Sequence, residues 1–238
     1  MTLLSTTPGT IRSGSFCRRL KSLMLDEEAS AAIEYAFVAP AFIALLLGIL
    51  HIALIYLAQE GLETAVEDSA RIIMTGQAQT TTMGSGTSAY FGMTATDFKN
   101  AICNGVTGKD ANLNTITYPR ALPPFLTCNR LAVNVQIAPS GCTAPTIVTP
   151  TFTLTNGTVS SSGSGFGTAN CDGTGKSTAG LTSSQGQLVI VQLAYLWPTV
   201  SAPLGLNFVN QTGGNRLLVA TYVFTVESYV CATGQSTC

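Results

Sequence analysis

One long apolar segment, residues 30–58, most strongly limits what this 238-residue chain can fold into. From Tyr35 to Leu57 the segment is long enough to cross the roughly 30 Å hydrocarbon layer of a bilayer as a helix. Glu34 lies near its start, and a carboxylate costs about 2.5–3.5 kcal/mol at the centre of a membrane helix and less near the interface. The segment therefore predicts a transmembrane helix whose carboxylate needs a partner, and an amine is the best candidate.

The charges on either side of the segment predict its orientation. Basic residues precede it, at Arg12, Arg18, Arg19 and Lys21, and acidic residues follow it, at Glu60, Glu63, Glu67 and Asp68. Basic flanks stay on the cytoplasmic side of a membrane. A cleaved secretory signal would have a shorter apolar core and an A-x-A-like exit, which this segment lacks. We therefore expect residues 1–29 to form a basic cytoplasmic leader and the C-terminal bulk to be exported.

The helical pattern continues beyond the predicted span. Apolar and small side chains recur at three- and four-residue intervals, at Leu62, Val66, Ser69 and Ile73, with acidic residues between them. This spacing is typical of an amphipathic helix with one buried face. Gly76 is a residue type that commonly follows a helix end. Residues 30–76 are thus predicted to form one helix to about Met74, with a transmembrane part and an amphipathic extension.

Residues 77–238 are predicted to form an exported β-rich domain. Four segments are rich in β-branched or aromatic residues and are bounded by Gly, Pro or Asn: residues 131–138, 146–154, 188–196 and 217–228. A short helix is expected around Asp97. The Gly/Ser/Thr-rich stretch 156–187 predicts a long exposed loop or a hairpin pinned by Cys171. The expected class is α+β, with a long N-terminal transmembrane helix followed by a mostly antiparallel β ectodomain with disulfides.

Cysteine usage agrees with export. Cys17 lies in the leader, and the six other cysteines follow the membrane segment, at Cys103, Cys128, Cys142, Cys171, Cys231 and Cys238. An even number in an oxidising compartment predicts disulfides, each worth about 2–4 kcal/mol. The sequence does not choose among the possible pairings. A zinc site is disfavoured, because C-x-x-C spacing is absent and the single histidine, His51, lies in the span, where we interpret it as a helix-packing residue.

Composition disfavours nucleic-acid binding and catalysis. Charged residues make up 10% of the chain, against roughly 25% in soluble domains, and the net charge is −1. The acidic residues of the exported part are scattered, so no catalytic residue, metal site, cofactor or small-molecule substrate is predicted. Asp172–Thr178 partly matches a phosphate-binding loop, but Asn170 occupies the position of the first glycine. We interpret this stretch as a turn-rich loop.

Particular motifs resemble a known family. Ser30–Tyr35 reads Ser-Ala-Ala-Ile-Glu-Tyr and resembles the start of mature pilins and pseudopilins of the tight-adherence (Tad) system. Pro40, Thr64–Arg71 and, near the other end, Arg216–Phe224 are similar to TadE-like minor pseudopilins, as is the stretch 195–198; residues 77–187 have no match. The resemblance implies a non-enzymatic minor pseudopilin that takes part in assembly of a Tad (Flp) type IV pilus, in the bacterial inner membrane with a periplasmic C-terminal domain.

The same resemblance implies a processing step and a set of partners. Cleavage by a prepilin peptidase after Ala29 would create an α-amine at Ser30, and Glu34 of an incoming subunit, followed by Tyr35 in the motif, would pair with that amine. The family's peptidase usually cuts after glycine, so Ala29 is a departure from the pattern. The implied partners are the membrane, other pilins and pseudopilins, the prepilin peptidase and the inner-membrane assembly platform.

Two other interpretations stay open. In the first, Glu34 is an interfacial carboxylate satisfied by water. In the second, the chain is an unprocessed, membrane-tethered envelope module for binding or adhesion. A tether would tolerate Glu34→Ala, whereas a polymerising subunit would not. An anchored hydrolase would need an acid or metal site that the sequence does not reveal.

Overall fold

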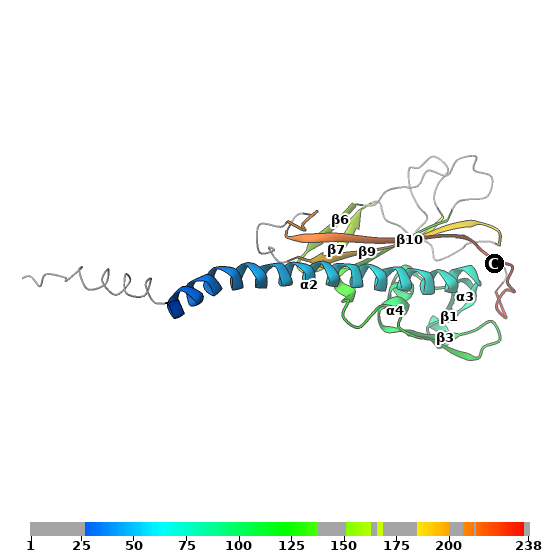
Figure 1. Ribbon diagram of the computed structural model, residues 1–238. Helices are drawn as coiled ribbons and strands as arrows, with labels where there is room; N and C mark the ends of the chain where they lie inside the picture. Colours follow the sequence, from blue (N-terminus) through cyan, green and yellow to red (C-terminus); the bar gives the residue numbers. More distant parts are fainter. Residues whose placement is uncertain are drawn as a thin grey trace, which may run out of the picture.

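The computed structural model describes residues 27–137, 151–162, 166–168, 185–199, 207–211 and 213–235. One helix, α2 (Glu27–Met74), runs through the molecule (Figure 1). Its C-terminal half lies between two layers, with the long strands on one side and the smaller helix and strands on the other, while its N-terminal part projects as a rod (Figure 1). At 1.5 Å per residue α2 is about 70 Å long.

The ends of α2 nearly match the prediction. The described helix begins at Glu27, upstream of the expected start at Ser30. It ends at Met74 as predicted, and Gly76 follows with φ 77°, a conformation that favours glycine. The amide of Glu227 donates to the carbonyl oxygen of Met74 at 2.9 Å, so the last turn is joined to the C-terminal segment.

The larger sheet has the order β10 (Asn215–Thr225), β9 (Leu188–Pro198), β5 (Leu131–Ile137) and β8 (Phe166–Thr168). β9 pairs antiparallel with both β10 and β5, and β8 pairs parallel with β5. Three predicted strands are therefore confirmed, with ends shifted by one to three residues. The mostly antiparallel α+β class is confirmed as well.

A second, smaller antiparallel sheet was not predicted. Its order is β2 (Tyr90–Phe91), β1 (Thr82–Met83), β3 (Val106–Lys109) and β4 (Thr115–Tyr118). The predicted short helix is α4 (Ala95–Asn104), which begins with a capping box between Thr94 and Asp97. The other short elements are α3 (Gln77–Thr80) and the single 3-10 turns η1 (Gly86–Ser88) and η2 (Cys128–Arg130).

A hairpin replaces part of the predicted loop. β6 (Thr151–Thr155) and β7 (Thr158–Ser162) pair through Asn156 and Gly157, both with positive φ, as a two-residue hairpin turn requires. The prediction of one loop over 156–187 is therefore wrong for β7 and β8. The alternative, a hairpin pinned by Cys171, is not tested, because the described hairpin pairs residues 151–155 with 158–162. β6 confirms the end of the strand predicted over 146–154. Residues 146–150, Cys171 and the 172–178 stretch lie outside the described residues.

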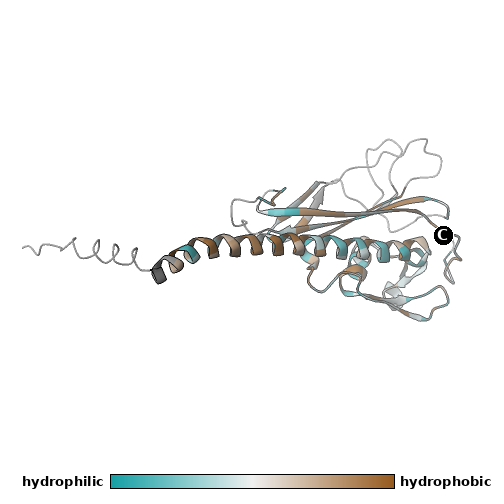
Figure 2. Ribbon diagram, in the orientation of Figure 1, coloured by the Kyte–Doolittle hydropathy of each residue, from teal (hydrophilic) through white to brown (hydrophobic). Residues whose placement is uncertain are grey.

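The core lies along the second half of α2. Its buried apolar side chains recur every three or four residues, at Ile55, Ala58, Leu62, Ala65, Val66, Ala70 and Ile73. They belong to one cluster with buried residues of β5, β9 and β10. Ser69 is also buried, and its hydroxyl donates to the carbonyl oxygen of Val66 at 3.0 Å. The predicted amphipathic extension is confirmed, and Figure 2 shows hydrophilic residues interrupting the helix only where it lies beside the domain and near its N-terminal end.

Candidate functional site

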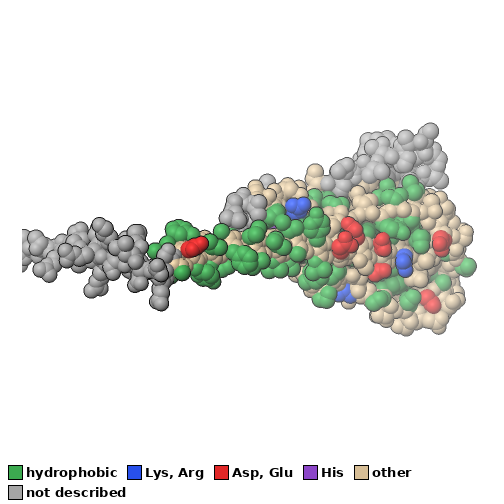
Figure 3. Space-filling view, viewed as in Figure 1, with side chains coloured by type: hydrophobic (Ala, Val, Ile, Leu, Met, Phe, Trp, Pro, Cys, Tyr) green, Lys and Arg blue, Asp and Glu red, His purple; other side chains and the backbone are tan. Residues whose placement is uncertain are grey.

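The rod formed by residues 31–54 of α2 exposes apolar side chains on all sides. Its large hydrophobic residues are 38–78% exposed, and Figure 3 shows hydrophobic side chains covering the rod, whereas most charged side chains gather over the domain. Among the described residues, α2 is the one helix long and apolar enough to cross a membrane, and 11% of its apolar window is buried. A core helix of a soluble domain would bury most of that surface. The rod therefore indicates membrane anchoring.

Glu34 is the charged residue of this rod. Of the Asp, Glu, Lys and Arg residues, it alone falls between Ala31 and Gln59. It is exposed, and no residue in the described part of the chain forms a hydrogen bond or ion pair with it. Tyr35 beside it is 73% exposed. Ala29 and Ser30 lie in the same helix about one turn earlier. The structure thus groups these four residues on one end of the rod, far from the domain.

Among the described residues, an aromatic contact joins the rod to the domain at His51. The ring of Phe208, from the segment before β10, lies 5.2 Å from the His51 ring, measured between centroids. Ile55, one turn further on, is 7% exposed. The predicted span from Tyr35 to Leu57 therefore overlaps the domain by about two turns. The part before His51, residues 31–50, is mostly exposed apart from the buried Gly48; it is about 30 Å long and matches the hydrocarbon layer by itself.

His51 packs against the domain of its own chain, whereas the sequence interpretation made it a helix-packing residue. Its partner is Phe208 of the same chain, not a side chain of another helix. Its Nε2 is buried and has no hydrogen-bond partner among the described residues. A hydropathy pattern could not have identified Phe208, because the two residues are far apart in the sequence.

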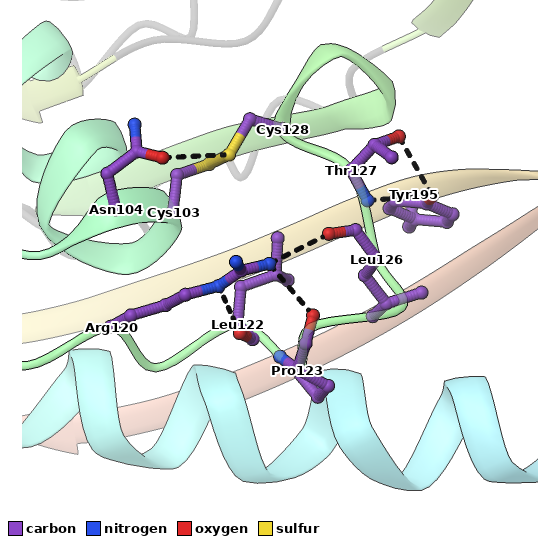
Figure 4. The surroundings of a disulfide bond; sticks show 9 residues. All are labelled: Cys103, Asn104, Arg120, Leu122, Pro123, Leu126, Thr127, Cys128 and Tyr195. Carbon is purple, nitrogen blue, oxygen red and sulfur yellow. Dashed lines mark hydrogen bonds between the residues drawn. A yellow bond between two sulfur atoms is a disulfide. The ribbon is translucent and has the colours of Figure 1, made fainter.

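One disulfide joins the layer of α4 to the start of β5. Cys103 of α4 and Cys128 of η2 are bonded across 25 residues of sequence, with their Cα atoms 5.6 Å apart (Figure 4). Cys231 is disulfide-bonded too. The other three cysteines of the predicted set, Cys142, Cys171 and Cys238, lie outside the described residues.

Arg120 fixes the loop that holds α2 on the side opposite the long strands. Its Nε donates to the carbonyl oxygen of Leu122 at 2.6 Å, and its Nη2 donates to those of Pro123 at 2.9 Å and Leu126 at 3.0 Å (Figure 4). Pro123 packs so closely on α2 that a Cβ added at Gly61 would lie 2.8 Å from its Cγ. Sequence reasoning missed this contact, although an arginine three residues before a Pro-Pro pair could have indicated a loop fixed by its side chain.

The comparison with protein families bears on the rod and its extension. Residues 29–71 match the family model described as TadE-like protein. Over this segment the chain is similar to TadE-like proteins. The match covers the helix from the predicted processing site to its last turn, and it confirms the resemblance to the TadE-like family there. No curated protein and no solved structure matches the chain.

The TadE-like family is a structural family associated with the Tad pilus, and the match therefore suggests a pilus-associated protein. In the described part of the chain, no group of three or more His, Cys, Asp or Glu residues could hold a metal ion. Among the described residues, the pKa values of four groups are shifted, each by a local cause. The hydrogen bond to Asp97 raises the pKa of Tyr90, burial lowers that of Lys99, and burial raises those of Tyr118 and Tyr229.

Proposed function

We propose that this protein is a minor pseudopilin that takes part in assembly of a Tad type IV pilus without catalysing a reaction. In this proposal α2 holds the chain in the bacterial inner membrane, with residues 1–29 cytoplasmic and the domain, residues 77–238, periplasmic. The disulfide between Cys103 and Cys128 supports an oxidising compartment for the domain. The partners are other pilins and pseudopilins, the prepilin peptidase and the assembly platform.

The observation that carries the proposal is the carboxylate of Glu34, which has no partner among the described residues and lies on an otherwise uncharged rod. A carboxylate in a bundle of lipid-embedded helices is costly unless an opposite charge faces it. Cleavage after Ala29 would place an α-amine at Ser30. The amine of one subunit and Glu34 of the next would then satisfy each other, which favours one register between neighbouring helices over others.

The continuity of α2 supports an assembly role for the domain. The helix runs unbroken from Glu27 to Met74, and the domain packs against its second half through the buried apolar stripe. Because rod and domain share one helix, any movement of the rod out of the membrane carries the domain with it. The register of the rod among other pilin helices would then set which face of the domain is presented.

The deciding experiment is N-terminal sequencing of the protein from membranes of cells with and without the prepilin peptidase. We expect a terminus at Ser30 only when the peptidase is present. An intact leader in both strains would contradict processing and favour a tethered envelope module.

A variant series tests the carboxylate directly. Glu34→Ala and Glu34→Gln should both abolish pilus assembly while the protein stays in the membrane. Glu60→Ala is the matched control, because Glu60 is an exposed carboxylate on the same helix beyond the rod. Normal pili with Glu34→Ala would contradict the proposed pairing.

A further inference from the structure

A cavity of about 390 Å³ lies where the rod enters the domain. α2 contributes Ile52, Ile55 and Tyr56 to its wall, and the other side comes from Phe208 and the first residues of β10. The lining is mainly apolar. Arg216 supplies its one cationic group, since Gln59 and the remaining lining residues are uncharged.

The depth of this cavity places it beside lipid headgroups. If residues 31–50 fill the hydrocarbon layer, Ile52 lies about 3 Å beyond it and Gln59 about 13 Å beyond it. The polar region adds roughly 5–8 Å on each side of a bilayer. Tyr56 is 66% exposed at this level, as is common for aromatic residues at a membrane interface. This depth rests on the membrane position of the rod in the proposed function, not on pilus assembly.

Arg216 has unused hydrogen-bonding capacity. It is half-buried, and its Nη1 donates to the carbonyl oxygen of Phe208 at 3.5 Å, a long contact. No carboxylate of the described residues forms an ion pair with it. In the strand register Arg216 lies opposite Trp197 of β9, so an indole shares this end of the sheet. A guanidinium has five N–H donors and binds phosphate in a two-pronged geometry.

A second cation lies at the same end of the sheet. Arg130 donates from Nη1 to the carbonyl oxygen of Leu196 and to Oδ1 of Asn215, both at 2.9 Å. Asn215 is the neighbour of Arg216 in β10. The membrane-proximal end of the larger sheet therefore carries two positive charges, while the next acidic residue of α2 after Glu34 is Glu60, on the side of the domain.

We propose that this cavity binds one anionic phospholipid, with its phosphate at Arg216 and an acyl chain along Ile52 and Phe208. The charge of Arg216 and the apolar lining match the two ends of such a lipid. The bound lipid would fill the junction between rod and domain.

Native mass spectrometry of the full-length, delipidated protein in detergent tests this assignment, with phosphatidylglycerol as the probe. We expect one tightly retained phosphatidylglycerol on the wild type and weaker retention of phosphatidylcholine. Arg216→Gln should weaken phosphatidylglycerol binding by roughly tenfold or more, because a charge-assisted contact is lost. Arg71→Gln removes an exposed cation at the far end of α2 and should have no effect.

Several outcomes would overturn the assignment. Equal retention by wild type and Arg216→Gln would remove Arg216 from the site. Displacement of the lipid by the same concentration of glycerol phosphate would show an anion site that does not recognise the acyl chain. If Arg216→Gln does not fold, Arg216→Lys keeps the charge and should retain phosphatidylglycerol in part. The site would be contradicted if Arg216→Lys retained phosphatidylglycerol no better than phosphatidylcholine.

The test is separable from the proposed function. Processing at Ser30 and the Glu34 variants report on pilus assembly and do not depend on Arg216. Extraction of the protein from membranes by carbonate would refute the membrane position on which the depth argument rests. Absence of a retained lipid on a carbonate-resistant protein would refute only the lipid site.

Discussion

Gln59 of α2 donates a hydrogen bond from Nε2 to the carbonyl oxygen of Val219 in β10, at 3.1 Å. The same Nε2 also lies 2.8 Å from Oε1 of Glu63 on the next turn. β10 is the last strand in the order of the larger sheet, so outward backbone groups there lack a neighbouring strand. The amide of Leu217 is satisfied similarly, by Oδ1 of Asn210 at 2.7 Å. Side chains thus close part of this edge, and helix and sheet are joined as one body.

The buried apolar stripe of α2 should contribute far more to the stability of the domain than the exposed apolar residues of the same helix. Leu62 is 0% exposed and Leu57 is 54% exposed. We expect Leu62→Ala to cost about 2–5 kcal/mol, because it removes buried methyl groups and leaves a cavity. Leu57→Ala, the matched control, should change the free energy of unfolding of the domain little. Thermal unfolding in detergent measures both, and equal losses would contradict the assignment of the two faces.

Gly76 is required by conformation and by space. Its φ is 77°, and a Cβ at this position would overlap the ring of Tyr229. We expect Gly76→Ala to destabilise the domain by roughly 2–5 kcal/mol, from left-handed strain and overpacking together. Gly86 also has positive φ, 59°, but a Cβ there meets nothing within 4 Å. Gly86→Ala should therefore show the strain alone, and a loss as large as that of Gly76→Ala would refute the role of Tyr229.

The elements predicted correctly are those with a long, periodic signal. α2 has an unbroken apolar run followed by a stripe with helical spacing, and β5, β9 and β10 are runs of seven to eleven residues rich in β-branched side chains. The smaller sheet has strands of only two to four residues. Such strands are held by their neighbours, as where Thr82 pairs with both Phe91 and Lys109, so local propensity does not reveal them.

In the candidate site, too, some residues stand out in the sequence and others are revealed only by the fold. Glu34 stands out in the sequence because a charge in an apolar run is rare. The end of the rod does not stand out, because Ile55 and Ala58 are as apolar as lipid-facing residues although they pack against protein. The contact between His51 and Phe208 joins residues distant in sequence, and no local pattern encodes it. Arg216 lies in a motif of the resemblance, but only the fold places it beside the rod.

The disulfide between Cys103 and Cys128 should contribute strongly to the stability of the layer that contains α4 and the smaller sheet. In the chain-entropy model, a bridge that closes about 25 residues contributes about 3.5 kcal/mol. We expect the double variant Cys103→Ala/Cys128→Ala to lower the free energy of unfolding by about that amount under non-reducing conditions. Urea unfolding with and without reductant measures the effect. The wild type in reductant should be at least as unstable, because Cys231 is also bonded.

Arg120 should stabilise the loop of residues 122–126 through geometry as well as charge. Its three hydrogen bonds end on backbone carbonyl oxygens, and Leu122 and Leu126 are 2% and 1% exposed. Arg120→Lys keeps the charge but cannot make three bonds in the same plane. We expect a loss of roughly 2 kcal/mol for Arg120→Lys and more for Arg120→Ala, because buried carbonyl groups lose their donors.

The location of this loss can be measured as well as its size. Hydrogen exchange should accelerate at the amide of Leu126, which donates to the carbonyl oxygen of Pro123 at 3.0 Å, and at that of Thr127, which donates to the Tyr195 hydroxyl at 3.1 Å. Strands β9 and β10 should keep their protection until global unfolding. Arg71→Lys controls for the conservative exchange on an exposed arginine. If Arg120→Lys exchanges at the wild-type rate at Leu126 and Thr127, the carbonyl contacts do not hold the loop against α2.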